Sequence, residues 1–273
     1  MLTVLIGTVL LQAVALALIM ALAWLVQHLT GNSGWIDVCW TLAVGSVGAA
    51  SALAGITGQA PLPTRQLVVA GLVIFWSLRL ASHIARRTLR HGDDPRYADL
   101  IRKWGSSAPL RLFGFAQTQA LAGVPLVLAV ALAAQRPEQV FGLQDWLGAI
   151  TWAIGISTAA FADRQIRLFA SDSSNRGKLC DQGLWAWSRH PNYFFEWLGW
   201  VGVALIAVDF SGNHLCGWIA VTAPVWMYWL LVQVSGIPPL EEHMLRSRGD
   251  RFSDYQKRTP AFFPWPPAAP LSR

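Results

Sequence analysis

The sequence predicts an all-α, polytopic membrane protein with seven transmembrane helices. Of its 273 residues, 54% are hydrophobic and only 13% are charged, whereas soluble domains carry about 25% charged residues. Apolar stretches long enough to cross a bilayer recur along the whole chain, and lysine and arginine gather in a few of the segments between them. These observations exclude an ordinary soluble globular protein. We expect residues 1–273 to form a single integral membrane domain.

The first predicted span, residues 2–26, contains no charged residue. As a helix it would be roughly 37 Å long, which is enough to cross a hydrocarbon core of about 30 Å with some tilt. No basic region precedes it and no clean small-residue cleavage site follows it. We therefore expect it to be retained as the first helix rather than removed as a signal peptide.

Six further apolar segments are expected to cross the bilayer, and glycine or proline residues separate several of them. Gly31 and Gly34 flank the turn before the second span, and Pro63 precedes the third. Pro137 precedes the fifth span, and Pro238 follows the seventh. The six segments are residues 35–56, 67–84, 110–134, 146–161, 193–208 and 216–234.

The basic residues predict an orientation for these helices. Of the 21 lysine and arginine residues, eight lie within 79–111, five within 164–189 and six within 246–273, and the other two are Arg65 and Arg136. Cytoplasmic loops are enriched in lysine and arginine, so we expect these three segments in the cytoplasm and the N-terminus outside. This bias accounts for the net charge of +6, and we therefore expect a lipid bilayer rather than nucleic acid as the partner.

The orientation of the helices in the membrane does not require acidic residues beside the spans. Asp37 is therefore a candidate catalytic residue. It follows the turn at 31–34 and precedes an apolar run. One interpretation is a first-turn carboxylate favoured by the helix dipole. The other is a carboxyl group in a membrane cavity, where desolvation favours a neutral acid that can donate a hydrogen bond to a substrate oxygen. The two interpretations are compatible.

Further polar residues cluster around the fifth and sixth predicted spans. Asp163 and Arg167 are four residues apart, a spacing that a simple surface pair on a helix would also have. Asn192 and Glu196 have the same spacing and follow Pro191, a residue suited to the first turn of a helix. Glu196 would lie about one turn inside a membrane segment, where an ionisable side chain is a functional candidate.

The sequence Arg-His-Pro-Asn-Tyr at 189–193, the acid Glu196, the later pair Glu241 and Glu242, and the turn at 249–255 carry a family resemblance. They resemble the C-terminal region of the steroid 5α-reductase family, in particular its bacterial members. The resemblance implies seven transmembrane helices in a bacterial inner membrane and NADPH bound from the cytoplasmic side. It also implies reduction of a carbon–carbon double bond conjugated to a ketone, with a 3-oxo-Δ4 steroid or another apolar enone as substrate.

The resemblance assigns roles to individual residues. The family's catalytic carboxylate falls on Asp37, and its companion tyrosine falls near Trp76, whose indole can donate a hydrogen bond but does not readily protonate an oxygen. Trp40 is expected to line the substrate cavity. The cofactor is expected mainly in the C-terminal half, about residues 146–265. The residues expected to bind NADPH are Arg79, Arg96, Tyr97, Asp163, Arg167, Lys178, Arg189, His190, Asn192, Tyr193, Glu196, Glu241, Glu242 and Tyr255.

Motifs of other nucleotide and metal sites are missing from the sequence. No Rossmann glycine fingerprint occurs, so the pyrophosphate of NADPH would be bound by arginine and lysine side chains. The three cysteines are far apart and form no CxxC pair. We therefore expect neither a disulfide framework nor a metal site.

Two other functions stay open. Isoprenylcysteine carboxyl methyltransferases, which use S-adenosylmethionine, share the Arg-His-Pro sequence, a tyrosine and a later pair of glutamates. Asn192 with Glu196, and Asp37 with the turn at 93–97, favour the reductase instead. A lipid transporter is the non-enzymatic alternative, and it would carry charges near several helix midpoints. Here the charges gather on one predicted side of the membrane.

Overall fold

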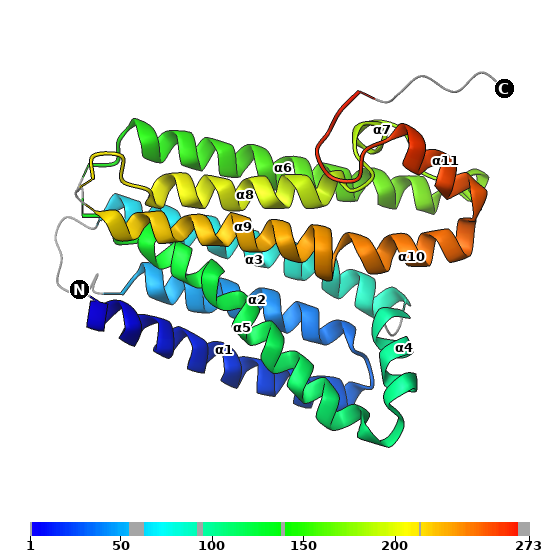
Figure 1. Cartoon of the computed structure of the whole chain (residues 1–273), viewed down its shortest axis with the longest axis horizontal. Helices are drawn as coiled ribbons and strands as arrows, with labels where there is room; N and C mark the ends of the chain where they lie inside the picture. The colour runs from blue at the N-terminus through cyan, green and yellow to red at the C-terminus, as the bar shows by residue number, and fades with distance from the viewer. Residues whose placement is uncertain (1, 55–62, 92–94, 138–139, 213, 267–273) are drawn as a thin grey trace. The chain divides into compact units, whose positions relative to one another are not determined.

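The computed structural model describes residues 2–54, 63–91, 95–137, 140–212 and 214–266, and within these residues all regular structure is helical (Figure 1). The predicted all-α class is confirmed for this part of the chain. The α-helices are α1 (Leu2–Thr30), α2 (Gly34–Ala52), α3 (Thr64–His91), α4 (Pro95–Trp104), α5 (Ala108–Ala134), α6 (Leu143–Ser171), α7 (Leu184–Trp187), α8 (Pro191–Ala207), α9 (Thr222–Trp229), α10 (Ile237–Arg248) and α11 (Asp250–Arg258). The shorter elements are the 3-10 helices η1 (Gly105–Ser107), η2 (Ser173–Asn175) and η3 (Leu215–Val221) and the π-helical η4 (Leu230–Val234).

Within the described residues, five stretches of helix are long and apolar enough to cross a membrane. They are Thr3–Thr30, Gly34–Ala52, Thr64–Arg90, Ile101–Ala134 and Leu215–Arg248, and each overlaps a predicted span. The other two predicted spans, 146–161 and 193–208, lie in α6 and α8. A straight helix of the 17 residues of α8 reaches about 26 Å, which is short of a hydrocarbon core of about 30 Å. Seven spans and the orientation of the termini stay predictions.

The chain divides into two compact units. The first unit comprises Met1–Trp146 and Val203–Ala223, and the second comprises Leu147–Gly202 and Pro224–Arg273. The predicted cofactor-binding half of the chain supplies most of the second unit.

In the first unit, α2 packs against α1, α3 and α5 (Figure 1). Small residues permit the close approach of α2 to α3. A Cβ atom added at Gly45 would lie 2.2 Å from Cβ of Ser77, and one added at Gly34 would lie 2.3 Å from Oγ1 of Thr88. Glycine at these two positions therefore lets α2, which carries Asp37 in its first turn, lie directly against α3.

A buried ion cluster in the first unit consists of Arg65, Arg136 and Asp145. Asp145 accepts hydrogen bonds from Nε and NH2 of Arg65 at 2.8 and 2.9 Å, and from NH2 of Arg136 at 3.1 Å. Arg136 also donates to the carbonyl oxygen of Ile206 at 2.7 Å. All three charged side chains are almost completely buried. Arg65 and Arg136, the two arginines outside the three basic segments of the sequence, are therefore part of the interior of this unit.

The charge of Asp145 is stabilised by its partners. Burial alone would raise the pKa of this carboxyl group, but the hydrogen bond from Arg65, a backbone N–H and the two positive charges together lower the pKa below its usual value. Asp145 is therefore a carboxylate at neutral pH, and it balances part of the charge of the two guanidinium groups.

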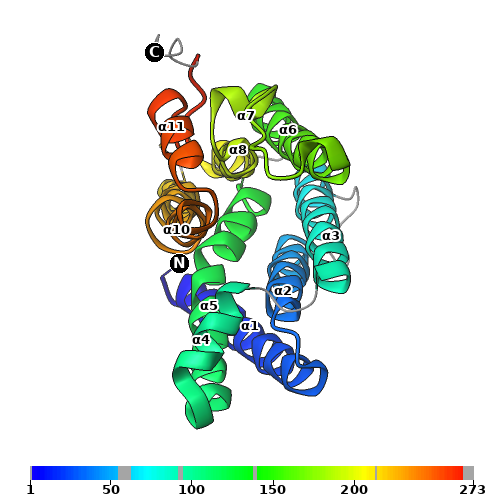
Figure 2. The ribbon, with the colours of Figure 1, turned by 90° about the vertical axis from the view of Figure 1, so that its right-hand side faces the viewer.

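In the second unit, α6 and α8 run side by side with their backbones in contact (Figure 1). A Cβ atom added at Gly155 would lie 2.6 Å from N of Gly199, and one added at Gly202 would lie 2.6 Å from O of Gly148. This is the small-residue packing typical of membrane helices. At the C-terminal end of the chain, α11 lies beside α10 (Figure 2).

Candidate functional site

Asp37 lies in the first turn of α2, at a helix start that is fixed by Asn32. The Asn32 side chain accepts a hydrogen bond from N of Gly34 at 3.0 Å and donates one to the carbonyl oxygen of Thr88 at 3.2 Å. The first contact satisfies a backbone N–H at the start of α2, and the second ties the preceding turn to α3. The Asp37 carboxylate is therefore not used as the helix cap and takes other partners.

Tyr97 of α4 and Gln119 of α5 contact the Asp37 carboxylate. The Tyr97 hydroxyl donates a hydrogen bond to Oδ1 of Asp37 at 2.8 Å. Nε2 of Gln119 donates to the Tyr97 oxygen at 3.1 Å and to Oδ1 of Asp37 at 3.4 Å. We call these three residues the acid–phenol cluster. Tyr97, which the sequence placed among the cofactor ligands, thus lies against the predicted catalytic acid.

Two aromatic side chains contact this cluster. Tyr97 is only 4% exposed, and its ring meets that of Phe115 edge to face at a centroid distance of 5.6 Å. The indole N–H of Trp40 donates to the carbonyl oxygen of Gln119 at 2.9 Å, and Trp76 is buried in α3. Hydrogen bonds are stronger in such apolar surroundings than in water. The cluster can therefore present a proton, held between a phenol and a carboxylate, to an oxygen atom of a bound molecule.

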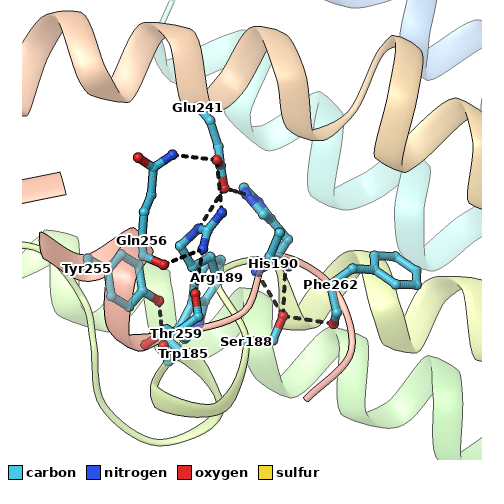
Figure 3. A network of polar contacts seen from close by, with 10 residues as sticks. Trp185, Ser188, Arg189, His190, Glu241, Tyr255, Gln256, Thr259 and Phe262 are labelled. Carbon is cyan, nitrogen blue, oxygen red and sulfur yellow. Dashed lines mark hydrogen bonds and ion pairs between the residues drawn. The ribbon is translucent and has the colours of Figure 1, made fainter. Parts of the chain in front are cut away.

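A second polar network lies in the second unit (Figure 3). Arg189 and Glu241 form a bidentate pair, with Nε–Oε1 and NH2–Oε2 distances of 2.8 and 3.0 Å. Nε2 of His190 lies 2.9 Å from Oε1 of Glu241, and Nε2 of Gln256 donates to Oε2 at 2.7 Å. Arg189 also donates to the carbonyl oxygen of Thr259. We call Arg189, His190, Glu241 and Gln256 the Arg–His–Glu cluster.

His190 is neutral in this network. Burial lowers the pKa of His190 below its usual value, and the opposing effect of its hydrogen bond to Glu241 is smaller. The imidazole therefore donates from Nε2 to the glutamate without carrying a charge. The ring of Tyr193 stacks on it at a centroid distance of 5.5 Å.

Hydrogen bonds from side chains to backbone oxygens join residues 185–188 to residues 255–262 (Figure 3). Oγ of Ser188 donates to the carbonyl oxygen of Phe262 at 3.0 Å, and the Tyr255 hydroxyl donates to the carbonyl oxygen of Trp185. Burial raises the pKa of Tyr255, so its hydroxyl stays protonated. The contacts of the Arg–His–Glu cluster and of Tyr255 join residues 185–190 to α10, α11 and Thr259, and they therefore hold the segment before α8 in place.

Asn192 and Asp163 join the start of α8 to α6. Nδ2 of Asn192 donates to Oδ1 of Asp163 at 3.1 Å, and Glu196, one turn later on α8, is 8% exposed. Oδ1 of Asn192 is buried and has no hydrogen-bond partner within the described part of the chain. A buried acceptor without a partner is costly. This position therefore suits an N–H or O–H group of a bound molecule.

Four other predicted cofactor residues are cationic. Arg79 is half-buried in α3, whereas Arg167 near the end of α6 and Lys178 in the following loop are exposed. The side chain of Arg96 lies outside the described residues. Arg167 and Lys178 are therefore accessible to solvent.

Two members of the clusters were not predicted from the sequence. Gln119 is one of four polar residues in the mostly apolar segment 110–134, beside Arg111, Gln117 and Thr118. Its polarity marks it as a candidate but does not separate it from these neighbours. Gln256 lies in the charged helix α11, where nothing in the sequence distinguishes it from its neighbours.

Replacing Glu241 with glutamine is expected to lower the free energy of unfolding by about 1.5–3 kcal/mol, because Arg189 and His190 keep their positions and lose a charged acceptor. The matched control is Glu242→Gln, since Glu242 is exposed on the same helix and pairs with Arg246 at 3.2 Å. It is expected to change stability by less than about 0.5 kcal/mol. Thermal unfolding in detergent measures both variants, and a parental Tm for Glu241→Gln would contradict the structural role.

Comparison with known proteins gives one match. Residues 23–259 match the profile of a family described as "Protein of unknown function (DUF1295)", and the matched range includes the acid–phenol cluster and the Arg–His–Glu cluster. No curated protein and no solved structure matches the chain significantly. Because the family profile covers most of its length, the chain belongs to the DUF1295 family.

Proposed function

We propose that this protein is a membrane-bound reductase that uses NADPH to reduce a carbon–carbon double bond conjugated to a ketone. The proposed substrate class is 3-oxo-Δ4 steroids, and the products are 5α-reduced. The observation that carries the proposal is the 2.8 Å hydrogen bond from Tyr97 to Asp37. The resemblance of the motif at 189–193 and of the pair at 241–242 to the steroid 5α-reductases supports the same reaction.

The reaction needs a hydrogen-bond donor at the ketone oxygen. When bound, NADPH supplies the hydride that adds to the β-carbon of the enone. Negative charge then develops on the ketone oxygen, and a donor placed there lowers the barrier. We assign this donor to Tyr97, with Asp37 orienting the phenol. Tyr97 thus takes the role that the sequence resemblance placed near Trp76.

The second unit contains groups that fit a dinucleotide. The buried Oδ1 of Asn192, which has no partner among the described residues, would accept a hydrogen bond from an amide or hydroxyl group of NADPH. Asp163 orients this side chain through the 3.1 Å contact. Arg167 and Lys178 are exposed cations suited to the phosphates. In the predicted topology these residues face the cytoplasm.

The methyltransferase alternative accounts for only part of these observations. It shares the Arg-His-Pro sequence and the later glutamates, so the Arg–His–Glu cluster fits both functions equally well. Methyl transfer from a sulfonium cofactor does not need a phenol that donates to a carboxylate in apolar surroundings. The acid–phenol cluster therefore favours the reductase.

Binding measurements on the purified protein in detergent test the proposal. NADPH is expected to bind and S-adenosylmethionine is not. Asn192→Ala is expected to weaken NADPH binding about tenfold, the effect of one hydrogen bond of about 1.4 kcal/mol. Asp37→Asn is the control and is expected to leave NADPH affinity unchanged. Parental NADPH affinity in Asn192→Ala would remove Asn192 from the cofactor site.

An activity measurement completes the test. Progesterone, a 3-oxo-Δ4 steroid, is expected to cause consumption of NADPH by the parent protein. Binding of S-adenosylmethionine without NADPH would replace the reductase with the methyltransferase. Binding of neither cofactor would favour the transporter.

A further inference from the structure

Gln119 is held beside the Tyr97 hydroxyl by contacts at both its backbone and its side chain. The indole N–H of Trp40 donates to the Gln119 carbonyl oxygen at 2.9 Å, which ties this turn of α5 to α2. The side-chain Nε2 donates to the Tyr97 oxygen at 3.1 Å and to Oδ1 of Asp37 at 3.4 Å. Gln119 therefore contacts both members of the proposed proton donor.

The orientation of the Gln119 amide follows from the carboxylate beside it. If the amide were turned over, Oε1 would lie in place of Nε2 at 3.4 Å from Oδ1 of Asp37, and two acceptors would face each other. In the orientation observed, Oε1 is buried and has no hydrogen-bond partner within the described residues. The hydrogen bonds from the nitrogen therefore hold the side chain, despite the cost of the unpaired oxygen.

We propose that Gln119 is a positioning residue that fixes the direction in which Tyr97 donates its proton, an inference that rests on the proposed reductase function. A phenol has one proton to donate and an oxygen that can also accept. Because Gln119 donates to that oxygen, the Tyr97 proton is directed to Asp37 or to a substrate ketone. Hydrogen bonds in a chain polarise one another, so the amide also makes Tyr97 a stronger donor as charge develops on the ketone oxygen.

Raman spectroscopy tests this direction without a substrate. The intensity ratio of the tyrosine Fermi doublet falls when a phenol that both accepts and donates hydrogen bonds becomes a pure donor. The chain has four tyrosines, and subtracting the spectrum of Tyr97→Phe isolates the signal of Tyr97. Gln119→Met keeps the side-chain size and removes the amide donor, so the ratio is expected to fall. The control Gln117→Met alters a glutamine of α5 that donates to Ala17 instead, and it should leave the ratio unchanged. An unchanged ratio in Gln119→Met would overturn the inference.

Kinetics test the consequence for catalysis. Gln119→Met is expected to lower kcat for progesterone reduction about ten- to a hundredfold, while KM for progesterone changes less than about twofold. Gln117→Met should turn over at the parental rate. An unchanged kcat in Gln119→Met would remove Gln119 from the mechanism. If the parent consumes no NADPH with progesterone, the reductase proposal fails, and the Raman comparison still decides whether Gln119 directs the Tyr97 proton.

Discussion

Replacing Asp145 with asparagine is expected to lower the free energy of unfolding by about 3–5 kcal/mol. Both Arg65 and Arg136 donate to this carboxylate in the interior of the first unit. A neutral amide removes the negative charge while the two guanidinium groups stay buried and close together, and breaking a buried pair in this way is strongly destabilising. Unfolding by titration with SDS, followed by tryptophan fluorescence, measures the change.

Two further variants separate the cluster from a general effect of losing an aspartate. Asp181→Asn is the control, since Asp181 is exposed and contacts Arg258 at 3.5 Å, and it is expected to cost less than about 1 kcal/mol. Arg136→Met should cost less in the Asp145→Asn background than in the parent, because the negative charge that pairs with Arg136 is already gone. Additive costs would contradict the coupling of the three side chains.

The helices could be predicted from apolar segments, but several extend further than those segments. The predicted third span ends at residue 84, whereas α3 continues to His91 through Arg86, Arg87 and Arg90. Arginine is a good helix former, so the helix continues where the apolar pattern ends. Hydropathy marks the part of a helix that suits a membrane, and backbone hydrogen bonding decides where the helix stops.

The sequence identified the candidate acid but not its partner. Asp37 is noticeable because a carboxylate beside an apolar run is unusual. Tyr97 lies 60 residues away in sequence on the short helix α4, and no periodicity in the chain predicts that these two side chains meet. The resemblance to the steroid 5α-reductases supplied residue types and approximate positions. It placed the family's tyrosine near Trp76 in α3. Only the path of the chain through α4 brings a tyrosine to the carboxylate.

Glu241 and Glu242 also show that the sequence does not reveal which side chains meet. Glu241 accepts hydrogen bonds from Arg189 and His190, whereas Glu242 is exposed and pairs with Arg246. Successive residues of a helix point in different directions, so a pair of acids in sequence does not form a pair in space. Which of them faces the interior depends on the packing of α10, and the sequence motif does not contain that information.

Replacing Tyr97 with phenylalanine is expected to lower the turnover of progesterone about a hundredfold or more, because the ring stays in place and the proposed donor to the ketone oxygen is lost. NADPH affinity should be unchanged, since the acid–phenol cluster lies outside the proposed cofactor contacts. Steady-state kinetics and NADPH titration measure the two quantities. The matched control is Tyr228→Phe, whose ring packs against Phe262 and whose hydroxyl has no proposed role. It should turn over at about the parental rate.

The acid and the phenol are expected to act as one group. Asp37→Asn should lower turnover by an amount similar to that of Tyr97→Phe, and the double variant should be little slower than either single variant, because residues that act as a unit are not additive. Multiplied losses in the double variant would instead assign the two side chains to separate steps. If Tyr97→Phe turned over at the parental rate while Asp37→Asn was impaired, the phenol would not be the donor. The indole of Trp76, the residue that the sequence resemblance indicated, would then be the group to replace next.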